Sequence, residues 1–294
     1  VVQVVEEVEK LTKYMSVRTV GIFGGVNINT QKTTVYQGCD ILVGTPGRIM
    51  DLTLDNVIRF EEMQKLVIDE FDEMLNLGFR VQLTALLAMM PKKRQNILFS
   101  ATMTDEVDAI LNDYFDYPEE VTLSASGTPL ENIQQITYNV PNFNTKINLL
   151  KHLLQNNEDM SRVLVFVNNK KISDMVHERI EEDFEGQFGV IHSNKSQNYR
   201  LSTMASFQEG NLRGLITTDI MARGLDISNI THVINFEMPE MPELYMHRIG
   251  RTGRADATGT AISLIAPREE ESKVEIEVLM NMELAIEPFP ETVE

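Results

Sequence analysis

Short runs of apolar residues alternate with stretches of helical periodicity along the whole sequence. Leu66-Val67-Ile68 and Val163–Val167 are apolar at every position, whereas Glu73–Met90 repeats its apolar residues at helical spacing. Strands that are apolar on both faces and separated by helices are typical of parallel sheets that helices cover on both sides. We therefore predict an α/β fold with mainly parallel sheets.

The same pattern places the individual strands and helices. In the first half of the chain the predicted strands are Arg18–Phe23, Asp40–Val43, Lys65–Ile68, Gln95–Phe99 and Glu120–Leu123. In the second half they are Ile133–Val140, Val163–Val167, Phe188–Ile191, Gly214–Thr217, His232–Asn235 and Thr260–Leu264. The predicted helices include Glu73–Met90, Lys171–Glu182, Ser196–Gln208 and an acidic helix at Arg268–Met282.

A break in this pattern divides the chain into two lobes. The segment Ser124–Pro129 is small and polar and contains both a Gly and a Pro, as linkers often do. A chain of 294 residues is long enough for two ordinary domains. We predict a first lobe at 1–124, a linker at 125–130 and a second lobe at 131–294.

The charge is strongly acidic and unevenly distributed. The net charge is -18, and the stretch from Glu269 to Glu294 holds nine Glu and one Lys. Nucleic-acid binding needs Lys and Arg side chains, so any such site must be a local basic groove on an acidic body. For the acidic helix we predict a solvated Glu face, and an electrostatic partner is the alternative.

Cysteine content and hydropathy exclude several classes of protein. Cys39 is the only cysteine, which excludes an internal disulfide and a cysteine-based zinc site and fits a reducing cytoplasm. No apolar run approaches the roughly 20 residues of a membrane span. The first residues lack the basic and apolar regions of a signal peptide. We therefore expect a cytoplasmic protein without a membrane partner.

Acidic residues follow the predicted strand Lys65–Ile68, in the order Asp69-Glu70-Phe71-Asp72-Glu73. Ligands of open parallel sheets bind at the carboxyl ends of the strands. Carboxylates there can hold Mg²⁺ through water beside nucleotide phosphates, and a neighbouring acid can activate the attacking water. A charged turn that caps a helix explains the stretch equally well.

Basic residues gather near the end of the second lobe. The segment His247–Arg254 holds three arginines and a histidine around two glycines. Glycines permit a tight backbone, and guanidinium groups match phosphate oxygens in pairs. We favour a phosphate-binding role over a basic surface turn.

Three further polar segments directly follow predicted strands. These are Gly44-Thr45-Pro46-Gly47-Arg48, Ser100-Ala101-Thr102 and Thr217–Asp226. The first has the backbone N–H groups, hydroxyl and Arg that suit a phosphodiester backbone. The two hydroxyls of the second either tether Asp72 or cap a helix that begins near Thr104. Acids in one lobe and arginines in the other suit phosphoryl transfer once the lobes close.

The ordered motif set resembles the DEAD-box RNA helicases, in particular bacterial members. It comprises GG (24–25), TPGR (45–48), DEFD (69–72), SAT (100–102), VFVNNKK (165–171), TTDIMARGLD (217–226) and HRIGRTGR (247–254). The resemblance runs through essentially the whole chain. It implies two tandem RecA-like lobes that bind ATP between them, with Mg²⁺, and RNA across both.

The resemblance also implies residue roles at the nucleotide. Asp69 and Glu70 would hold the Mg²⁺ shell, and Glu70 would place the hydrolytic water. Asp72 would link to Ser100 and Thr102 and couple hydrolysis to closure. The remaining residues implied here are Arg251 and Arg254 as arginine fingers, His247 as their support, Asp226 at the ribose and Arg223 as a bridge between the lobes.

For RNA the resemblance implies contacts with the sugar–phosphate backbone, so sequence selectivity should be low and the 2′-OH should distinguish RNA from DNA. The residues implied in the first lobe are Gly24, Gly25, Thr45, Pro46, Gly47 and Arg48. Those implied in the second lobe are Asn168, Lys170, Thr218, Asp219, Gln197 and Arg200.

The chain departs from the family pattern in three places. Phe71 replaces the alanine of the name motif, and we predict that it packs in the core. His192-Ser193-Asn194 stands where the family has His-Gly-Asp, which puts a tight turn in question. The adenine-reading segment and the G-x-x-x-x-G-K-[ST] P-loop do not occur in the sequence. We expect Val1 to be a truncation point, and this chain alone to bind and hydrolyse ATP poorly.

Two other functions remain open from the sequence. One is an RNA-binding or scaffold protein that keeps the backbone grip without a P-loop and performs no chemistry. The other is a superfamily 2 helicase that acts on DNA. The motif set favours ATP-dependent unwinding of RNA over both.

Overall fold

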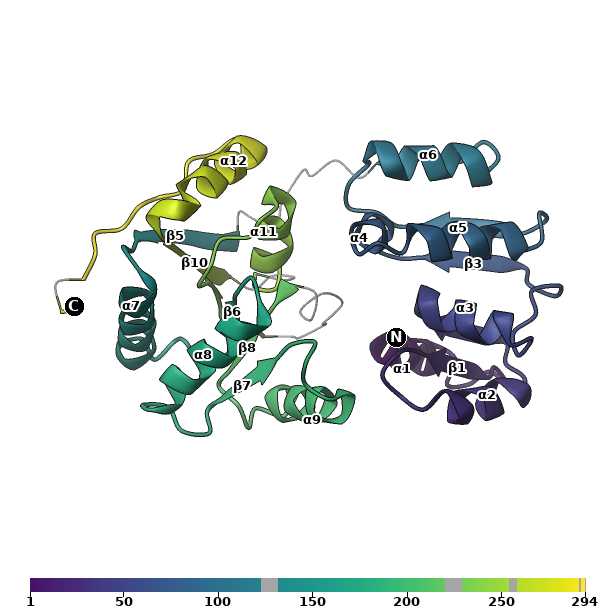
Figure 1. Ribbon diagram of the computed structural model, residues 1–294, viewed down its shortest axis with the longest axis horizontal. Coiled ribbons are helices and arrows are strands. Elements are labelled where there is room, and N and C mark those ends of the chain that lie inside the picture. Colours follow the sequence, from purple (N-terminus) through teal and green to yellow (C-terminus); the bar gives the residue numbers. More distant parts are fainter. Residues whose placement is uncertain (123–131, 220–228, 254–257, 291, 294) are drawn as a thin grey trace. The chain divides into compact units, whose positions relative to one another are not determined.

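The computed structural model describes residues 1–122, 132–219, 229–253, 258–290 and 292–293 (Figure 1). The chain forms two compact units, Val1–Thr122 and Leu123–Glu294. The predicted linker, 125–130, lies outside the described residues. Among the described helices, none has the length and apolar character that crossing a membrane requires.

The first unit alternates helices with short parallel strands. In chain order its elements are α1 (Val2–Leu11), β1 (Thr19–Ile22), α2 (Ile28–Tyr36), β2 (Ile41–Gly44), α3 (Pro46–Leu54), β3 (Lys65–Ile68), α4 (Phe71–Asn76), α5 (Arg80–Met89), β4 (Gln95–Leu98) and α6 (Asp105–Tyr114). Within the described residues, β1 pairs with β2 and β3 pairs with β4, both in parallel. Each pair has its own apolar cluster, around Ile22 and Leu52 for the first and around Ile68 and Phe71 for the second.

Two predictions for this unit are wrong. Glu73–Met90 is not one helix, because the chain is interrupted at Gly78, which has a φ of 81° that continuing α-helix does not allow. Glu120–Leu123 is not a strand in its described part, 120–122. Val121 is 79% exposed, so this segment lacks the packed surface that a buried strand needs.

The second unit contains one six-stranded parallel sheet. In chain order its elements are β5 (Ile133–Asn139), α7 (Phe143–Asn156), β6 (Val163–Phe166), α8 (Lys170–Glu181), β7 (Phe188–Ile191), α9 (Gln197–Gln208), β8 (Gly214–Thr217), β9 (His232–Asn235), α11 (Pro242–Ile249), β10 (Gly259–Ile265) and α12 (Glu270–Met280). The strand order is β5-β10-β9-β6-β8-β7. From β6 the chain builds β7 and β8 on one side and β9 and β10 on the other, so the order reverses at β6. Ligands of such sheets bind where the order reverses.

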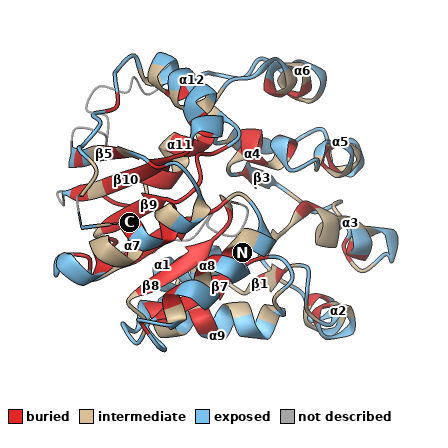
Figure 2. Ribbon diagram, turned by 60° about the vertical axis from the view of Figure 1, so that its left-hand side comes forward, coloured by how far each residue is buried: buried red, intermediate tan, exposed pale blue. Residues whose placement is uncertain are grey.

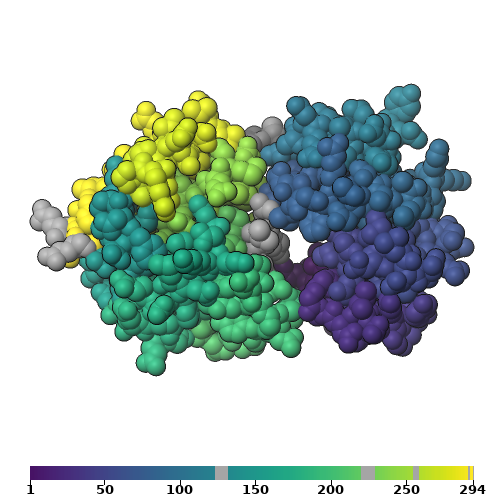
Figure 3. All heavy atoms as spheres, in the orientation of Figure 1, coloured from purple at the N-terminus to yellow at the C-terminus, as the bar shows by residue number. Residues whose placement is uncertain are grey.

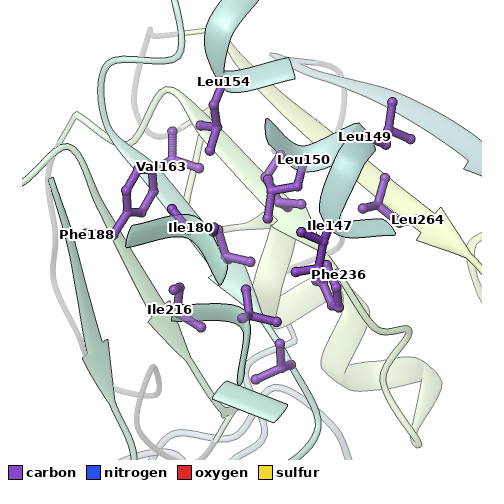
Figure 4. Close-up of a cluster of buried hydrophobic side chains, with 14 of the residues drawn as sticks. Ile147, Leu149, Leu150, Leu154, Val163, Ile180, Phe188, Ile216, Phe236 and Leu264 are labelled. Carbon is purple, nitrogen blue, oxygen red and sulfur yellow. The ribbon is translucent and has the colours of Figure 1, made fainter. Parts of the chain in front are cut away.

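Helices cover both faces of this sheet. Val163 and Val165 of β6 pack with α7 and α8 in the cluster of Figure 4, which includes Leu150 and Ile180. The alternate residue Leu164 belongs to a second cluster with Phe207 of α9. Side chains of successive strand residues point to opposite faces, so the two clusters lie on opposite sides of the sheet. Figure 2 shows the strands as the buried layer of this unit, as continuous apolar strands predict.

The acidic helix α12 lies at the surface of its unit (Figure 3). It is shorter than predicted because Asn281 adopts the left-handed conformation and ends it. Glu270, Glu271 and Glu275 are exposed, as a solvated face requires. Glu269 differs from them, because it is buried and its Oε2 accepts a hydrogen bond from Lys146 Nζ at 2.5 Å.

Candidate functional site

The first acidic pair lies where β3 ends and α4 begins. Asp69 is exposed, and its Oδ1 accepts a hydrogen bond from the Glu70 backbone N–H at 3.0 Å. Glu70 has φ 50° and ψ 50°, the left-handed conformation, and precedes the first residue of α4. A non-glycine residue in this region costs about 1–3 kcal/mol, and such strain is concentrated at functional sites. The chain thus turns from strand to helix within two carboxylate-bearing residues, Asp69 and Glu70, and the second of them is strained.

The donor set of this turn suits Mg²⁺ better than a metal that needs a complete protein cage. Among the described residues, no group of three or more His, Cys, Asp or Glu side chains gathers closely enough to hold a metal ion. Mg²⁺ usually keeps several waters and takes only one or two carboxylates besides substrate phosphates. Asp69 and Glu70 offer these oxygens at the carboxyl end of a parallel strand.

Asp72 is buried and held by the loop that follows β4. Its Oδ2 accepts from the Thr102 backbone N–H at 2.8 Å and from Thr102 Oγ1 at 2.7 Å. Ser100 Oγ accepts from the Asp72 N–H at 3.3 Å and donates to the Thr102 carbonyl at 2.7 Å. Burial raises the pKa of Asp72, but the hydrogen bonds from Thr102, the Glu73 backbone and Ser100 outweigh it and lower that pKa. Asp72 is therefore a fixed carboxylate.

These contacts decide between the two explanations for the hydroxyls that follow β4. Ser100 and Thr102 are tied to Asp72. The cap of α6 is Thr104, whose Oγ1 accepts from the Val107 N–H at 3.3 Å. Phe71 is fully buried and packs with Ile68 and the helices of its cluster, which confirms that its ring is a core residue.

The candidate RNA segments of the first unit share one sheet edge. Ile22 pairs with Gly44 in the parallel register, so the loop at Gly24–Gly25 and the segment Thr45–Arg48 follow adjacent strand ends. Thr45 precedes α3 and Pro46 is its first residue, where a missing N–H costs nothing.

Arg48 is already engaged within the unit. Its Nη1 donates to Gln31 Oε1 at 2.6 Å and to the Val26 carbonyl at 3.3 Å. The observed contacts of Arg48 thus hold the glycine loop against α3. Direct binding of RNA by Arg48 stays a prediction.

Glycines at this edge fall into two kinds. A Cβ on Gly44 would lie 2.7 Å from Ile22 Cγ1 and 2.8 Å from Ile49 Cγ1, so packing within the unit requires glycine there. A Cβ on Gly24 or Gly47 would meet no atom within 4 Å. Neither has a positive φ, so nothing in the described part of the chain demands glycine at these two positions. Close approach of a ligand to the backbone is one physical reason for glycine at such a position.

In the second unit, three neighbouring strands are each followed by a polar residue, and the number of residues after the paired strand position is the same in all three. Phe166 of β6 pairs with both Thr217 of β8 and Asn235 of β9. Asn168, Asp219 and Glu237 each stand two residues beyond these paired positions, at the point where the strand order reverses. The Asn168 N–H donates to Glu237 Oε2 at 2.9 Å, and Asn168 Nδ2 donates to the Met238 carbonyl at 2.8 Å.

A buried arginine of α11 joins these strand ends. Arg248 is 1% exposed. Its Nε and Nη2 donate to the two carboxylate oxygens of Asp219 at 2.6 and 2.8 Å. Nη2 also donates to Asn168 Oδ1 at 3.0 Å, and Nη1 donates to the Glu237 carbonyl at 2.6 Å.

The segment 247–254 as a whole predicts a phosphate role, and the resemblance assigns that role to Arg251 and Arg254, whereas Arg248 has a different environment. Its guanidinium is buried against Asp219, Asn168 and Glu237. The pattern does carry one signal for this: Arg248 falls within the amphipathic helix, adjacent to the apolar Ile249.

The basic segment continues beyond α11. His247 lies in its last turn, and Arg251 Nε donates to the His247 carbonyl at 3.0 Å. Thr252 Oγ1 donates to the Ile230 carbonyl at 2.5 Å, and a Cβ on Gly253 would lie 2.6 Å from Ile133 Cγ1. The turn that carries Arg251 is therefore anchored to the sheet. Three predicted site residues lie outside the described residues: Arg254, Arg223 and Asp226.

The remaining candidate RNA residues lie around α8 and α9. Lys170 is exposed at the start of α8, and its Nζ donates to Asn194 Oδ1 at 3.0 Å. Gln197 and Arg200 are in the first turn of α9, and Thr218 is buried just after β8.

The unusual His192-Ser193-Asn194 segment does form a turn. Its stability comes from the ring of His192, whose Nδ1 accepts from the Asn194 N–H at 3.3 Å. The His192 Nε2 lies 3.0 Å from Asp174 Oδ1.

Comparison with known protein families covers both units. Residues 1–110 match the DEAD/DEAH box helicase family, and residues 145–256 match the helicase conserved C-terminal domain. A DEAD-box ATP-dependent RNA helicase CshA from Geobacillus kaustophilus is 40% identical over 268 residues, which cover 91% of this chain and 57% of that protein. The CshA of Bacillus subtilis is 38% identical over 269 residues, which cover 92% of this chain and 54% of that protein. The chain thus spans about half the length of the curated relatives it matches.

Solved structures show the same architecture. Dbp5 of S. cerevisiae bound to RNA and ADP BeF3 superimposes with a TM-score of 0.86 at 26% identity, covering 97% of this chain and 74% of that chain. A DEAD box protein from Methanococcus jannaschii is 34% identical, with a TM-score of 0.52, covering 98% of this chain and 77% of that chain. The fold is therefore that of tandem RecA-like lobes, as predicted.

Replacing Thr102 by Val should destabilise the first unit. The change removes the hydroxyl bond to the Asp72 carboxylate, so we expect the free energy of unfolding to fall by about 1.5 kcal/mol. The pKa of folded Asp72 is below its ordinary 3.8, so this stabilisation is present above pH 3.8 and is lost as the pH falls through the lowered value. Urea titrations at several pH values measure the effect.

Thr53→Val is the matched control, because Thr53 Oγ1 donates to a neutral carbonyl, that of Ile49. Its effect should not depend on acidic pH. Equal pH profiles for the two variants would contradict the role of Asp72 as a fixed carboxylate.

Proposed function

This chain belongs to the DEAD-box helicase family, and on that premise we propose that the protein is an ATP-dependent RNA helicase. The single observation that carries the proposal is the chemistry of the two carboxyl edges. The first unit presents a strained acidic turn at Asp69–Glu70, and the second presents an anchored basic turn at Arg251. The similarity to an ATP-dependent RNA helicase CshA and to Dbp5 bound to RNA and ADP BeF3 supports the same function.

At the nucleotide, we assign the residues of the first unit to water and metal. Asp69 and Glu70 would hold Mg²⁺ through water, and the ion would neutralise charge on the β- and γ-phosphates. Glu70 would accept the proton of the attacking water and orient it. The Asp72 carboxylate accepts two hydrogen bonds from Thr102, so it can fix the Ser100–Thr102 loop beside that site.

From the second unit, Arg251 would donate to the phosphoryl group as charge develops on it. Its backbone is held by Thr252 and Gly253, which limits the loss of freedom on binding. We assign supporting roles to His247, and by resemblance to Arg254, Arg223 and Asp226. Hydrolysis would then require both units to engage one nucleotide, and we propose that this closure locally separates an RNA duplex.

On the RNA side, we propose contacts with the sugar–phosphate backbone. Gly24, Gly25 and Gly47 would let the backbone of the first unit approach closely. In the second unit Lys170, Gln197 and Arg200 would offer side chains, and the segment at Thr218 would offer backbone groups. Such contacts give low sequence selectivity. The net charge of -18 predicts weak long-range electrostatic attraction between the protein and RNA, so RNA binding should depend on these local contacts.

The experiment that tests this function measures ATP hydrolysis by the full-length protein with Mg²⁺. RNA, single-stranded DNA and no nucleic acid form the three arms, and RNA and DNA duplexes report unwinding. We expect RNA to stimulate ATP hydrolysis and single-stranded DNA not to stimulate it. Stimulation by DNA alone would indicate a DNA helicase, and RNA binding without hydrolysis would indicate a scaffold. The 294-residue chain tested alone should bind nucleotide weakly.

Glu70→Gln should stop turnover while ATP-dependent RNA binding persists, because the amide cannot take the proton of water. We expect hydrolysis to slow by about 10²-fold or more. Single-turnover hydrolysis and RNA binding with ATP, measured on the same preparation, check this. Turnover near the wild-type rate would exclude Glu70 as the base.

Arg251→Ala should slow RNA-stimulated hydrolysis by about 10³–10⁵-fold, the range of arginine fingers. The half-saturating RNA concentration should change much less. A loss below about tenfold would show that Arg251 acts only in packing.

Gly47→Ala should separate stability from binding. Ala favours helix over Gly, so we expect the free energy of unfolding to rise by up to about 1 kcal/mol. RNA affinity should fall about threefold or more, because the new methyl group occupies space that the backbone of RNA approaches. Thermal unfolding and fluorescence titration with a short RNA measure the two effects.

Gly44→Ala is the control for crowding inside the unit. It should destabilise the protein by about 1–3 kcal/mol, because its Cβ meets Ile22 and Ile49. Unchanged RNA affinity in Gly47→Ala would remove the assignment of this backbone to RNA.

A further inference from the structure

We infer that Arg248 is a positioning residue that couples RNA contact in the second unit to the placement of Arg251. The inference deepens the proposed function and rests on it. Arg248 itself touches neither ligand in this account. When the strand ends that face RNA move, Arg248 moves the helix that carries the arginine finger.

The hydrogen bonds of Arg248 exclude it as a phosphate ligand. A guanidinium has five N–H donors in a fixed plane. The Nε group and the two Nη groups donate to acceptors on Asp219, Asn168 and Glu237, and Nη1 also lies 3.4 Å from Asn235 Oδ1. With its side chain 1% exposed and its donors occupied, Arg248 is not available to a ligand.

The acceptors of Arg248 come from three adjacent strand ends. Asn168 follows β6, Asp219 follows β8 and Glu237 follows β9. Asn168 and Asp219 belong to the segments that we assign to RNA. If either segment moves when RNA binds, the guanidinium of Arg248 must move with it. Otherwise the bidentate ion pair between Arg248 and Asp219, which is buried from water, must break.

Arg248 is also connected to the proposed arginine finger, Arg251. Arg248 and Arg251 are three residues apart, and the Arg251 N–H donates to the Arg248 carbonyl at 3.0 Å. Arg251 Nε donates to the carbonyl of His247, the residue before Arg248. The backbone around Arg248 therefore holds both the main chain and the side chain of Arg251.

The forked geometry of the Arg248 guanidinium means that replacement by lysine can test its hydrogen bonds separately from its charge. Lysine keeps the positive charge but presents a single ammonium, which cannot donate in parallel to both Asp219 oxygens and reach Asn168 and Glu237. Arg248→Lys therefore keeps the charge of the site and removes the connection.

The test uses Arg248→Lys and Asp219→Asn in the full-length protein. The readouts are the maximal stimulation of ATP hydrolysis at saturating RNA and the half-saturating RNA concentration. We expect maximal stimulation to fall about tenfold or more in both variants, as the loss of a coupling between sites predicts. A residue that only binds RNA would raise the half-saturating concentration and leave the maximum intact.

Arg213→Lys is the matched control at the opposite end of β8. Arg213 is half-buried, and it donates to the carbonyls of Met160 and Leu154 at 2.7 Å, at the end of β8 opposite to the strand ends that we assign to RNA. Its substitution should lower thermal stability and leave maximal stimulation unchanged. The control thus reports what loss of a structural arginine alone does.

Four outcomes overturn the inference. Wild-type stimulation in Arg248→Lys contradicts coupling, and an equal loss in Arg213→Lys shows a general effect of stability. Failure of both Arg248→Lys and Asp219→Asn to fold shows a purely structural role. A wild-type protein without RNA stimulation removes the proposed function itself, and the coupling with it, so the two failures are distinguishable.

Discussion

A buried ion pair between Arg248 and Asp219 organises the carboxyl edge of the second unit. Parallel strands bring polar residues together at this edge, where the sheet no longer supplies hydrogen-bond partners. A charge taken out of water there needs a partner with complete hydrogen bonding. The guanidinium satisfies Asp219 and reaches Asn168 and Glu237 as well, so one side chain fixes the ends of β6, β8 and β9.

The first unit also has a charged group that is taken out of water at its carboxyl edge, and the hydrogen-bond partners of that group are smaller. Asp72 Oδ2 accepts from a backbone N–H and a hydroxyl of Thr102, and no guanidinium is involved among the contacts that the structure describes. Asp69 and Glu70, on the same turn, remain more accessible. Each edge therefore combines a fixed ionised group, Asp72 or Arg248, with a more exposed group of the same charge. This division between positioning and reacting residues is what phosphoryl transfer requires, since its catalysis depends on placement and charge.

The sequence predicted much of this arrangement, and the reason is physical. Apolar runs define buried strands almost to the residue, as in Phe188–Ile191 and Gly214–Thr217, and motifs that follow them must lie at the carboxyl edge. Burial of polar groups was not predictable in the same way. Arg248 is fully buried, and its place within an amphipathic helix is the one signal of this in the sequence. The break near Gly78 was missed because apolar spacing continues across it, and the role of Glu269 was missed because it adjoins a run of exposed glutamates.

The most direct test of the account is hydrogen exchange at the backbone amides of Asn168, Asp219 and Arg251 in the full-length protein. Exchange is compared with and without RNA in the presence of a non-hydrolysable ATP analogue. Protection should rise at all three amides together in the wild type, and Arg251 should lose its share of the increase in Arg248→Lys. Protection of Asn168 and Asp219 without any change at Arg251 in the wild type would contradict the coupling.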